Sequence, residues 1–355
     1  MNRDVLPVRP RVLVTGGAGF IGSHFVRSAL RGEYPGITPA ELVVLDKLTY
    51  AGRLENLAPV AGDDRMRFVH GDICDARLVE DVMTGVDLVV HFAAESHVDR
   101  SIAGSDAFTR TNVLGTQVLL SAALRAGVRR FTHVSTDEVY GSINEGSWAE
   151  DAPLEPNSPY AASKASSDLL VRAYHRTHGL PVCVTRCPNN YGPHQFPEKI
   201  IPLFVSNLLD GRPVPLYGDG LNVREWLHVD DHCRAVALVA ERGRPGEVYN
   251  VGPGTPLSNL ELTRLLLEAV GADASMVMPV ADRKGHDRRY AVDATKIAGE
   301  LGFTPRVPFG EGLAATVAWY AGRRDWWEPL RDPALPTEAP VPVNASAGGD
   351  RDHAD

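Results

Sequence analysis

The sequence predicts an α/β fold with a doubly wound parallel sheet and a smaller mixed α/β lobe in its C-terminal part. In the first half of the chain, short β-branched runs alternate with longer amphipathic stretches. This alternation is typical of a parallel sheet covered by helices on both faces. After Pro188, loops rich in Gly and Pro separate shorter elements, and this change of pattern predicts the smaller lobe.

The first half is expected to contain six buried strands and four helices. The strands are predicted at residues 11–15, 42–46, 67–70, 88–92, 131–135 and 182–186. The helices are predicted near residues 21–30, 78–83, 107–126 and 160–177. A further apolar run at residues 248–251 is expected to be a buried strand that returns to the main sheet.

The composition of this 355-residue chain excludes several classes of protein. Hydrophobic residues make up 44% and charged residues 23%, which excludes wholesale disorder. The net charge of −9 argues against nucleic acid or a membrane as a partner. Residues 1–10 lack an apolar signal-peptide core, and no apolar run approaches the roughly 20 residues of a membrane span, so we expect a cytoplasmic protein. The four cysteines form no CxxC pair and are expected to be buried thiols.

A glycine-rich turn follows the first predicted strand and opens a helix. Gly16, Gly19 and Gly22 allow a tight turn, a close backbone approach to a pyrophosphate, and close packing of the helix on the sheet. Asp46 ends the second strand, where a carboxylate suits the free 2′-hydroxyl of NAD and would repel the 2′-phosphate of NADP. Lys47 beside it softens that preference. The pattern predicts a Rossmann-type domain that binds NAD.

These observations predict a division of the chain. We expect an N-terminal arm (1–10), an NAD-binding domain (11–188, with 226–252 returning to it), a substrate-binding lobe (189–225 and 253–330) and a disordered tail (331–355). The tail is rich in Pro, Ala and Asp and has no periodicity, which favours disorder.

A YxxxK motif begins the helix predicted at residues 160–177. Tyr160 and Lys164 stand at i and i+4, so they share one face of the helix. The ammonium is expected to lower the pKa of the phenol below its usual value of about 10, which would make the tyrosine a base for alcohol oxidation. An exposed Tyr/Lys pair is the alternative, but the preceding dinucleotide motif favours the catalytic interpretation.

Two carboxylates follow the fifth predicted strand, in the run Thr136-Asp137-Glu138. A solvated acidic turn is the alternative interpretation. Alcohol oxidation alone needs Ser/Thr, Tyr and Lys, whereas adjacent Asp and Glu suit a further step in which one group removes a carbon-bound proton and the other protonates a departing hydroxyl. The run therefore favours an elimination.

With these motifs in place, the chain resembles the dTDP-glucose 4,6-dehydratases of the extended short-chain dehydrogenase/reductase family. The resemblance extends over nearly the whole chain up to the tail, with Lys284 and Pro188 as small departures from the family pattern. It is carried by the stretches TGGAGFIGSH (15–24), LDKLTYAG (45–52), GDICD (71–75), HFAAESHVDRSI (91–102), STDEVYG (135–141), SPYAASKASSD (158–168), NNYGPHQFPEKIIP (189–202), LYGDGLNVREWLHVDDH (216–232) and DRKGHDRRYAVD (282–293).

The resemblance implies the roles of the catalytic residues. Tyr160, assisted by Lys164 and Thr136, would take the proton of the glucose 4-hydroxyl while the C4 hydride passes to NAD. Glu138 would then remove the C5 proton, Asp137 would protonate the leaving C6 hydroxyl, and the hydride would return to C6. The product would be a 4-keto-6-deoxy sugar.

Motifs and resemblance together also give the binding residues, with a nucleotide-diphosphate sugar, dTDP-glucose, as the substrate. Cofactor contacts are expected at Gly16, Gly19, Phe20, Ile21, Gly22, Asp46, Lys47, Thr49, Asp72, Ile73, Ala93, Ala94, Ser96, Thr111, Ser135, Tyr160, Lys164 and Asn190. Substrate contacts are expected at Ser96, Thr136, Asn189, Lys199, Ile200, Pro215, Leu216, Tyr217, Arg224, Asn259, Arg283, His286 and Asp287. For Asp72 the alternative is a helix cap, and for Tyr217 and Asp287 a core position and a salt bridge.

Several expectations complete the hypothesis. His97 and the pair Asp230-Asp231 could suggest a metal site, but the chemistry needs no metal and none is expected. The family forms homodimers through the helices predicted at residues 107–126 and 160–177. A nucleotide-sugar 4-epimerase is the nearest alternative, because it shares the glycine turn and the YxxxK motif. A non-catalytic dinucleotide-sensing protein is the alternative from another class.

Overall fold

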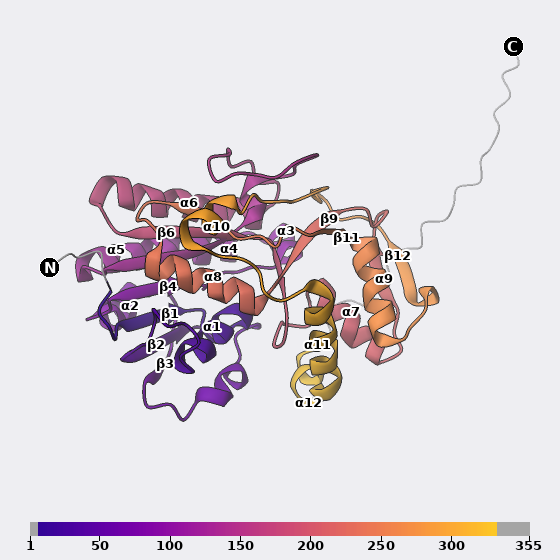
Figure 1. Cartoon of the computed structure of the whole chain (residues 1–355), viewed down its shortest axis with the longest axis horizontal. Helices are drawn as coiled ribbons and strands as arrows, with labels where there is room; N and C mark the ends of the chain where they lie inside the picture. The colour runs from indigo at the N-terminus through magenta and orange to yellow at the C-terminus, as the bar shows by residue number, and fades with distance from the viewer. Residues whose placement is uncertain (1–5, 332–355) are drawn as a thin grey trace, which may run out of the picture.

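The computed structural model describes residues 6–331 as a large α/β unit with a smaller lobe beside it (Figure 1). The predicted fold class is confirmed. Residues 1–5 of the expected arm, and the expected tail beyond Arg331, lie outside the described residues. Within residues 6–331, no helix has the length and apolar character needed to cross a membrane.

The main sheet has seven parallel strands in the order β10-β6-β5-β4-β1-β2-β3. The observed strands agree with the predicted ones to within one residue at each end, and the run near residue 250 pairs with β6. The bounds are β1 Arg11–Thr15, β2 Glu41–Asp46, β3 Met66–His70, β4 Leu88–His91, β5 Arg130–Thr136, β6 Val182–Cys187 and β10 Val248–Asn250.

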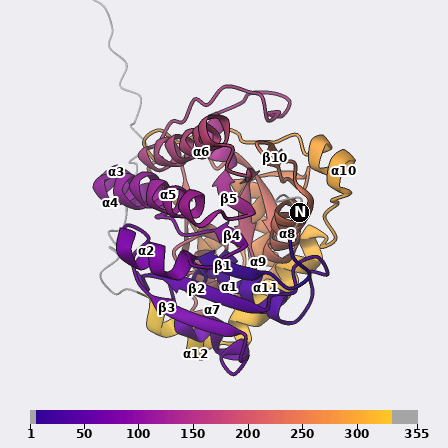
Figure 2. The ribbon, with the colours of Figure 1, turned by 90° about the vertical axis from the view of Figure 1, so that its left-hand side faces the viewer.

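Helices cover both faces of this sheet, each over its own apolar core. Figure 2 shows α1 (Phe20–Leu30) and α8 (Val229–Arg242) on one side. On the other side lie α2 (Ala76–Met83), α5 (Thr116–Ala126) and α6 (Pro159–His178). The crossover order leaves the carboxyl ends of the strands free at one edge, where ligands bind in open α/β sheets.

The helix predicted at residues 107–126 is not uniform. It consists of a short α4 (Asp106–Phe108), a π-helical segment η2 (Thr109–Gly115) and α5. The π segment contains Asn112, whose side chain bonds the backbone of Glu95 and the hydroxyl of Ser163. A second helix in this region, α3 (Val98–Ala103), begins after His97, whose ring caps it.

The smaller lobe contains two small sheets. One has the order β11-β9-β7 and the other pairs β12 with β8. Residues 226–228, expected to return to the main sheet, instead belong to β9; only α8 and β10 make that return. The bounds are β7 Asn189–Tyr191, β8 Val214–Tyr217, β9 Val223–His228, β11 Pro256–Ser258, β12 Val277–Val280, α7 Ile200–Leu209, α9 Asn259–Val270, α10 Thr295–Leu301, α11 Phe309–Gly322 and α12 Arg324–Trp327.

Candidate active site

A cavity of about 470 Å³ runs along the carboxyl edge of the main sheet and continues between the sheet and the smaller lobe. Every residue expected to contact the cofactor lines it. The expected catalytic and substrate residues also line it, with two exceptions, Asp137 and Leu216.

The glycine-rich turn forms one end of the cavity. Gly16 has a φ of +69°, and a Cβ there would lie 2.6 Å from the amide nitrogen of Ala93. A Cβ on Gly22 would lie 2.2 Å from the carbonyl oxygen of Gly16. These contacts require glycine at both positions, and they allow α1 to begin at Phe20 with its N-terminus facing the cavity. A helix N-terminus in this position favours an anion.

Asp46 is held at the end of β2 by backbone groups. One carboxylate oxygen accepts from the amide of Ala18 at 2.9 Å and the other from that of Leu48 at 2.8 Å. Lys47 pairs with Asp72 at 2.8 Å, so these two residues form an ion pair over this end of the cavity. The helix-cap interpretation of Asp72 is wrong, because Asp75 caps α2.

Asp75 accepts hydrogen bonds from the amides of Arg77 and Leu78 at the start of α2. The Asp72 carboxylate instead accepts from the amide of Cys74, within the turn that precedes the helix.

Tyr160 and Lys164 project from the first turns of α6. Ser158 caps this helix by accepting from the amide of Ala161, and Pro159 occupies its first position, so the sequence fixes where the helix starts. The Lys164 ammonium donates to the carbonyl oxygen of Val134 at 2.8 Å. Burial lowers the pKa of Lys164 to about 8.

The expectation that Lys164 lowers the pKa of Tyr160 is wrong for this structure. Burial and then the nearby charge of Glu138 raise the pKa of Tyr160 well above its usual value, and a hydrogen bond with Thr136 opposes this only in part. The Lys164 ammonium is hydrogen-bonded to a backbone carbonyl. Its effect on the pKa of Tyr160 is therefore smaller than the effect of burying the phenol.

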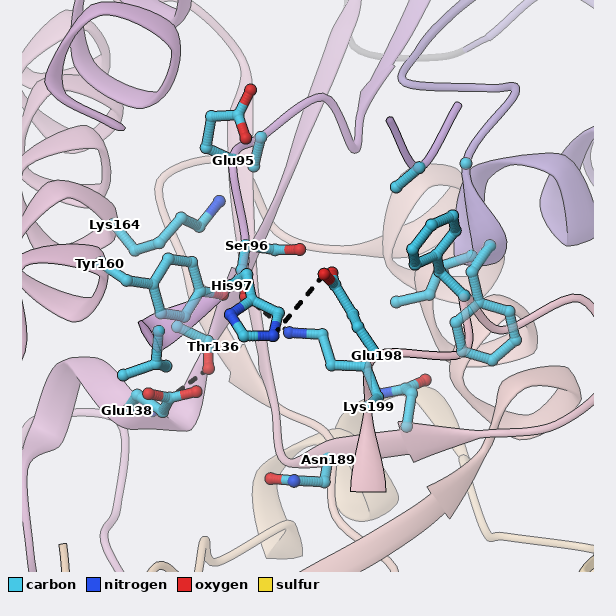
Figure 3. A pocket seen from close by; sticks show the side chains of 18 of the residues that line it. Glu95, Ser96, His97, Thr136, Glu138, Tyr160, Lys164, Asn189, Glu198 and Lys199 are labelled. Atoms are coloured by element: carbon cyan, nitrogen blue, oxygen red, sulfur yellow. Dashed lines mark hydrogen bonds and ion pairs between the residues drawn. The ribbon is translucent and has the colours of Figure 1, made fainter. Parts of the chain in front are cut away.

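Two carboxyl groups follow β5 on a 3-10 turn, η3 (Asp137–Tyr140), which Thr136 caps by accepting from the amide of Glu138. Glu138 lines the cavity on the same side as Thr136 and Tyr160 (Figure 3). Asp137 is 2% exposed and lies behind the cavity surface, accepting from the Thr136 hydroxyl at 3.2 Å. The alternative of a solvated acidic turn is therefore excluded.

The surroundings affect the pKa values of the two carboxyl groups differently. Burial raises the pKa of Asp137 well above its usual value, and the neighbouring Glu138 raises it further. Burial also raises the pKa of Glu138, but Arg224 and Lys199 oppose that rise. The pair thus favours a protonated Asp137 beside an ionisable Glu138, the combination that an acid and a base need.

Cations gather at the lobe side of the cavity. Arg224 on β9 donates to the backbone oxygens of Val223 and Asp287, at 2.7 and 2.9 Å. Arg283 forms a two-pronged ion pair with Asp99 of α3, with contacts of 2.6 and 2.8 Å. Lys199 lies immediately before α7, and its side chain connects the lobe to the main domain.

The Lys199 ammonium donates to the backbone oxygen of Ser96 at 2.8 Å. Leu216, expected at the substrate, is 8% exposed and packs away from the cavity because neighbouring residues of β8 alternate in direction. Its neighbours Pro215 and Tyr217 do line the cavity.

Sequence reasoning missed a group around Glu198. This carboxylate lies 3.3 Å from Arg100 and 3.6 Å from the ring of His97, and Arg100 stacks over the ring of Tyr50. Figure 3 shows the Glu198 carboxylate directed at the ring of His97, with Lys199 next to them. Glu198 belongs to the FPEK segment (196–199), in which only Lys199 was predicted to be a site residue. Only the fold brings His97 and Tyr50 to that carboxylate.

The carboxyl edge of this doubly wound sheet brings together a glycine-rich turn, a Tyr/Lys pair and a threonine next to the tyrosine. Together these features define the class of extended short-chain dehydrogenases/reductases. A family model described as GDP-mannose 4,6 dehydratase matches residues 13–316. The chain is 61% identical to the dTDP-glucose 4,6-dehydratase of Streptomyces niveus, over 93% of this chain and 98% of that one. The chain therefore belongs to the dTDP-glucose 4,6-dehydratase family, as the sequence resemblance indicated.

Solved structures agree with this assignment. The dTDP-glucose 4,6-dehydratase DesIV of Streptomyces venezuelae, solved with NAD bound, is 66% identical, with a TM-score of 0.90 covering 90% of this chain and all of that one. The UDP-glucose 4-epimerase of Thermotoga maritima is more distant, at 34% identity and a TM-score of 0.80 over 88% of this chain and 99% of that one.

Proposed function

We propose that this protein is an NAD-dependent lyase that converts dTDP-glucose to dTDP-4-keto-6-deoxyglucose. The observation that carries the proposal is the carboxyl pair Asp137-Glu138, which directly follows β5 beside Tyr160. A 4-epimerase needs oxidation and reduction at C4 but no acid and base for elimination. The proposal is supported by the identity to dehydratases, which is well above that to the epimerase.

NAD would lie along the expected cofactor residues. The glycine turn and the N-terminus of α1 suit its pyrophosphate, and the Asp46 carboxylate suits a ribose hydroxyl. The Asp46 charge favours NAD over NADP. When bound, NAD accepts a hydride from C4 of the sugar and returns it to C6.

In the oxidation step, Tyr160 takes the proton of the 4-hydroxyl, and the Thr136 hydroxyl holds that oxygen in place. The high pKa of the buried Tyr160 means that its deprotonation depends on compensating positive charge. Lys164 stands one helical turn away on the same face of α6, and a pKa of about 8 leaves it mostly protonated at neutral pH.

In the elimination step, Glu138 removes the C5 proton, which the new 4-ketone makes acidic. Arg224 and Lys199 favour the ionised form of Glu138 that this requires. Asp137 protonates the leaving C6 hydroxyl. Because Asp137 lies just behind the cavity surface, this role requires its carboxyl group to turn towards the cavity when the substrate is bound.

The lobe would bind the rest of the substrate. Arg224 and Lys199 are suited to the diphosphate, because both are cations on the lobe side of the cavity, near Glu138. The guanidinium of Arg224 also offers a planar set of hydrogen-bond donors that matches phosphate oxygens. Asn189 would contact the sugar. Remaining substrate contacts would be Ser96, Ile200, Pro215, Tyr217, Asn259, Arg283, His286 and Asp287, all of which line the cavity.

We also propose that the protein is a cytoplasmic homodimer formed through α5, the π segment before it and α6. Leu114 and Leu169 support this, because both are large apolar side chains about half exposed on these elements. Equilibrium sedimentation tests it: Leu169→Glu should yield monomers, and an unchanged mass would contradict this interface.

The activity is tested with purified protein, no added cofactor and a panel of dTDP-, UDP- and GDP-glucose. We expect loss of water and a keto sugar, fastest with dTDP-glucose, because NAD is regenerated in each turnover. Formation of a galactose nucleotide would instead indicate an epimerase, and binding without any turnover would indicate a sensing protein.

A further inference from the structure

A buried charged cluster lies one turn of α6 beyond Lys164, and the reaction as proposed makes no use of it. Its centre is Asp168, whose side chain has no exposed surface. Arg186 of β6 donates to Asp168 at 2.9 Å, and the ring of His133 on β5 lies 3.4 Å from the same carboxylate. His133 and Arg186 are buried as completely as Asp168.

Geometry links this cluster to the active site through a single helix. Tyr160, Lys164 and Asp168 occupy successive i, i+4 positions of α6, so their side chains follow one another along one face. All three are buried, at 9%, 5% and 0% exposure, against the carboxyl half of the main sheet. The order along the helix is therefore phenol, ammonium, carboxylate, with the phenol at the cavity and the carboxylate deepest.

We propose that Asp168, fixed by Arg186 and His133, is a positioning residue for Lys164: it supplies the buried counter-charge that holds the ammonium charged and in place beside Tyr160. The inference rests on the proposed function, because Lys164 matters there as the partner of the tyrosine base. A largely buried ammonium with one carbonyl as its hydrogen-bond acceptor needs an opposite charge nearby, and Asp168 lies one turn away on α6.

Electrostatics agree with this geometry. Burial lowers the pKa of Lys164 to about 8, and the charge of Asp168 is the strongest influence that opposes this decrease. Although its own burial works against ionisation, Arg186 and His133 lower the pKa of Asp168 to about 2, so the counter-charge persists at every working pH. Burial also lowers the pKa of His133 to about 4, which leaves its ring neutral near neutral pH.

The other titratable groups around Lys164 do not replace Asp168. His91 of β4 is buried, and burial lowers its pKa well below the usual value, so it is neutral. Burial raises the pKa of Cys187 on β6 to a level at which it stays a thiol. Arg186 is a cation, and Tyr160 stays protonated until it acts. On the cavity side, Asp137 and Glu138 act on Tyr160.

The test is a titration of the lysine side chains by NMR after selective isotope labelling. The chain contains only five lysines, and the signal of Lys164 is assigned as the one missing from Lys164→Arg. In Asp168→Asn we expect the Lys164 titration to move to lower pH by about one unit, and the alkaline limit of kcat/KM to move with it.

A second variant covers the risk that Asp168→Asn leaves Arg186 buried without a partner and unfolds the protein. Asp168→Asn/Arg186→Gln removes both charges together and should still lower the Lys164 titration, since Asp168 acts on Lys164 more strongly than Arg186 does. His133→Asn is the matched control, because it removes a neutral neighbour of Asp168 while the ion pair with Arg186 remains and keeps Asp168 charged; the Lys164 titration should stay where it is.

Folded Asp168 variants with an unmoved Lys164 titration would overturn the inference, as would an equal displacement in His133→Asn. Turnover of dTDP-glucose by the wild-type protein is measured separately. Absence of that turnover refutes the proposed function, whereas the titration reads the state of Lys164 without any substrate.

Discussion

At the scale of single residues, the site depends on two adjacent carboxyl groups with different surroundings. Asp137 lies behind the cavity surface, next to the negative charge of Glu138, and therefore tends to keep its proton. Glu138 faces Arg224 and Lys199, which favour its anion. Their order and identity were predictable from the sequence. The burial of Asp137 was not, because it depends on how the turn after β5 packs under the lobe.

Removing either carboxyl group should separate the two halves of the reaction. In Glu138→Gln and Asp137→Asn we expect elimination to slow by a factor of about 10² to 10⁴, while oxidation at C4 is largely retained. Reduced cofactor and the 4-keto hexose should accumulate, which absorbance near the nicotinamide band and rapid-quench mass spectrometry measure. Equal loss of oxidation and elimination, with cofactor binding intact, would contradict the assigned roles.

At the scale of elements, periodicity was enough to predict the strands of the main sheet, since most of them are short, largely buried apolar runs. It was not enough for the segment before α5. There the helix widens around Asn112, which bonds Glu95 and Ser163 from distant parts of the chain. The placement of residues 226–228 in the small sheet likewise depends on long-range pairing, of β9 with β7 and β11.

Close packing at the start of α1 gives a prediction for this element. Gly22→Ala adds a Cβ that would overlap the carbonyl oxygen of Gly16, so we expect loss of NAD binding and of stability despite the better helix propensity of alanine. Bound NAD is measured after purification, and the melting temperature by calorimetry. Gly299→Ala in α10 is the matched control, since a Cβ there meets nothing within 4 Å.

The control should gain up to about 1 kcal/mol of stability and keep its cofactor. If the two variants behave alike, the close approach of the α1 backbone to the glycine turn does not matter for binding.

The cap of α6 links helix stability to catalysis. Ser158→Ala removes the side chain that accepts from the amide of Ala161, and should cost about 1 kcal/mol and lower kcat because the first turn carries Tyr160. Asp75→Ala removes a comparable cap from α2 and should cost similar stability while kcat at saturating NAD stays unchanged. Equal kcat in both variants would show that the cap does not position the tyrosine.

At the scale of the whole molecule, the protein buries several histidines in neutral form. Burial lowers the pKa of His133 to about 4 and that of His232 to about 3, while the same groups in the unfolded chain titrate near 6.5. Below about pH 6.5 the unfolded state therefore binds more protons than the folded state. The free energy of unfolding should fall as the pH is lowered from 6.5 towards 4.

Chemical denaturation at a series of pH values measures this effect. His232 lies in α8 and is fully buried, so His232→Leu should flatten the slope between pH 6 and 4 by up to about 1.4 kcal/mol per pH unit. Parallel curves for the variant and the wild type would mean that His232 does not contribute to acid sensitivity.

The two-part architecture was predictable in outline from the change of pattern after Pro188 and from the motifs on either side of it. The sequence did not predict which side chains meet across the cavity, such as Arg283 with Asp99 or Glu198 with Arg100. Those pairs join α3, which has only six residues, to the lobe, and no local pattern specifies them.

The most direct test of the account follows a deuterium label placed at C4 of dTDP-glucose. If Tyr160, Glu138 and Asp137 act on one hexose as proposed, the label should appear at C6 of the 4-keto-6-deoxy product, carried there within a single active site. A label that stays at C4, with or without inversion of that centre, would contradict the proposed reaction.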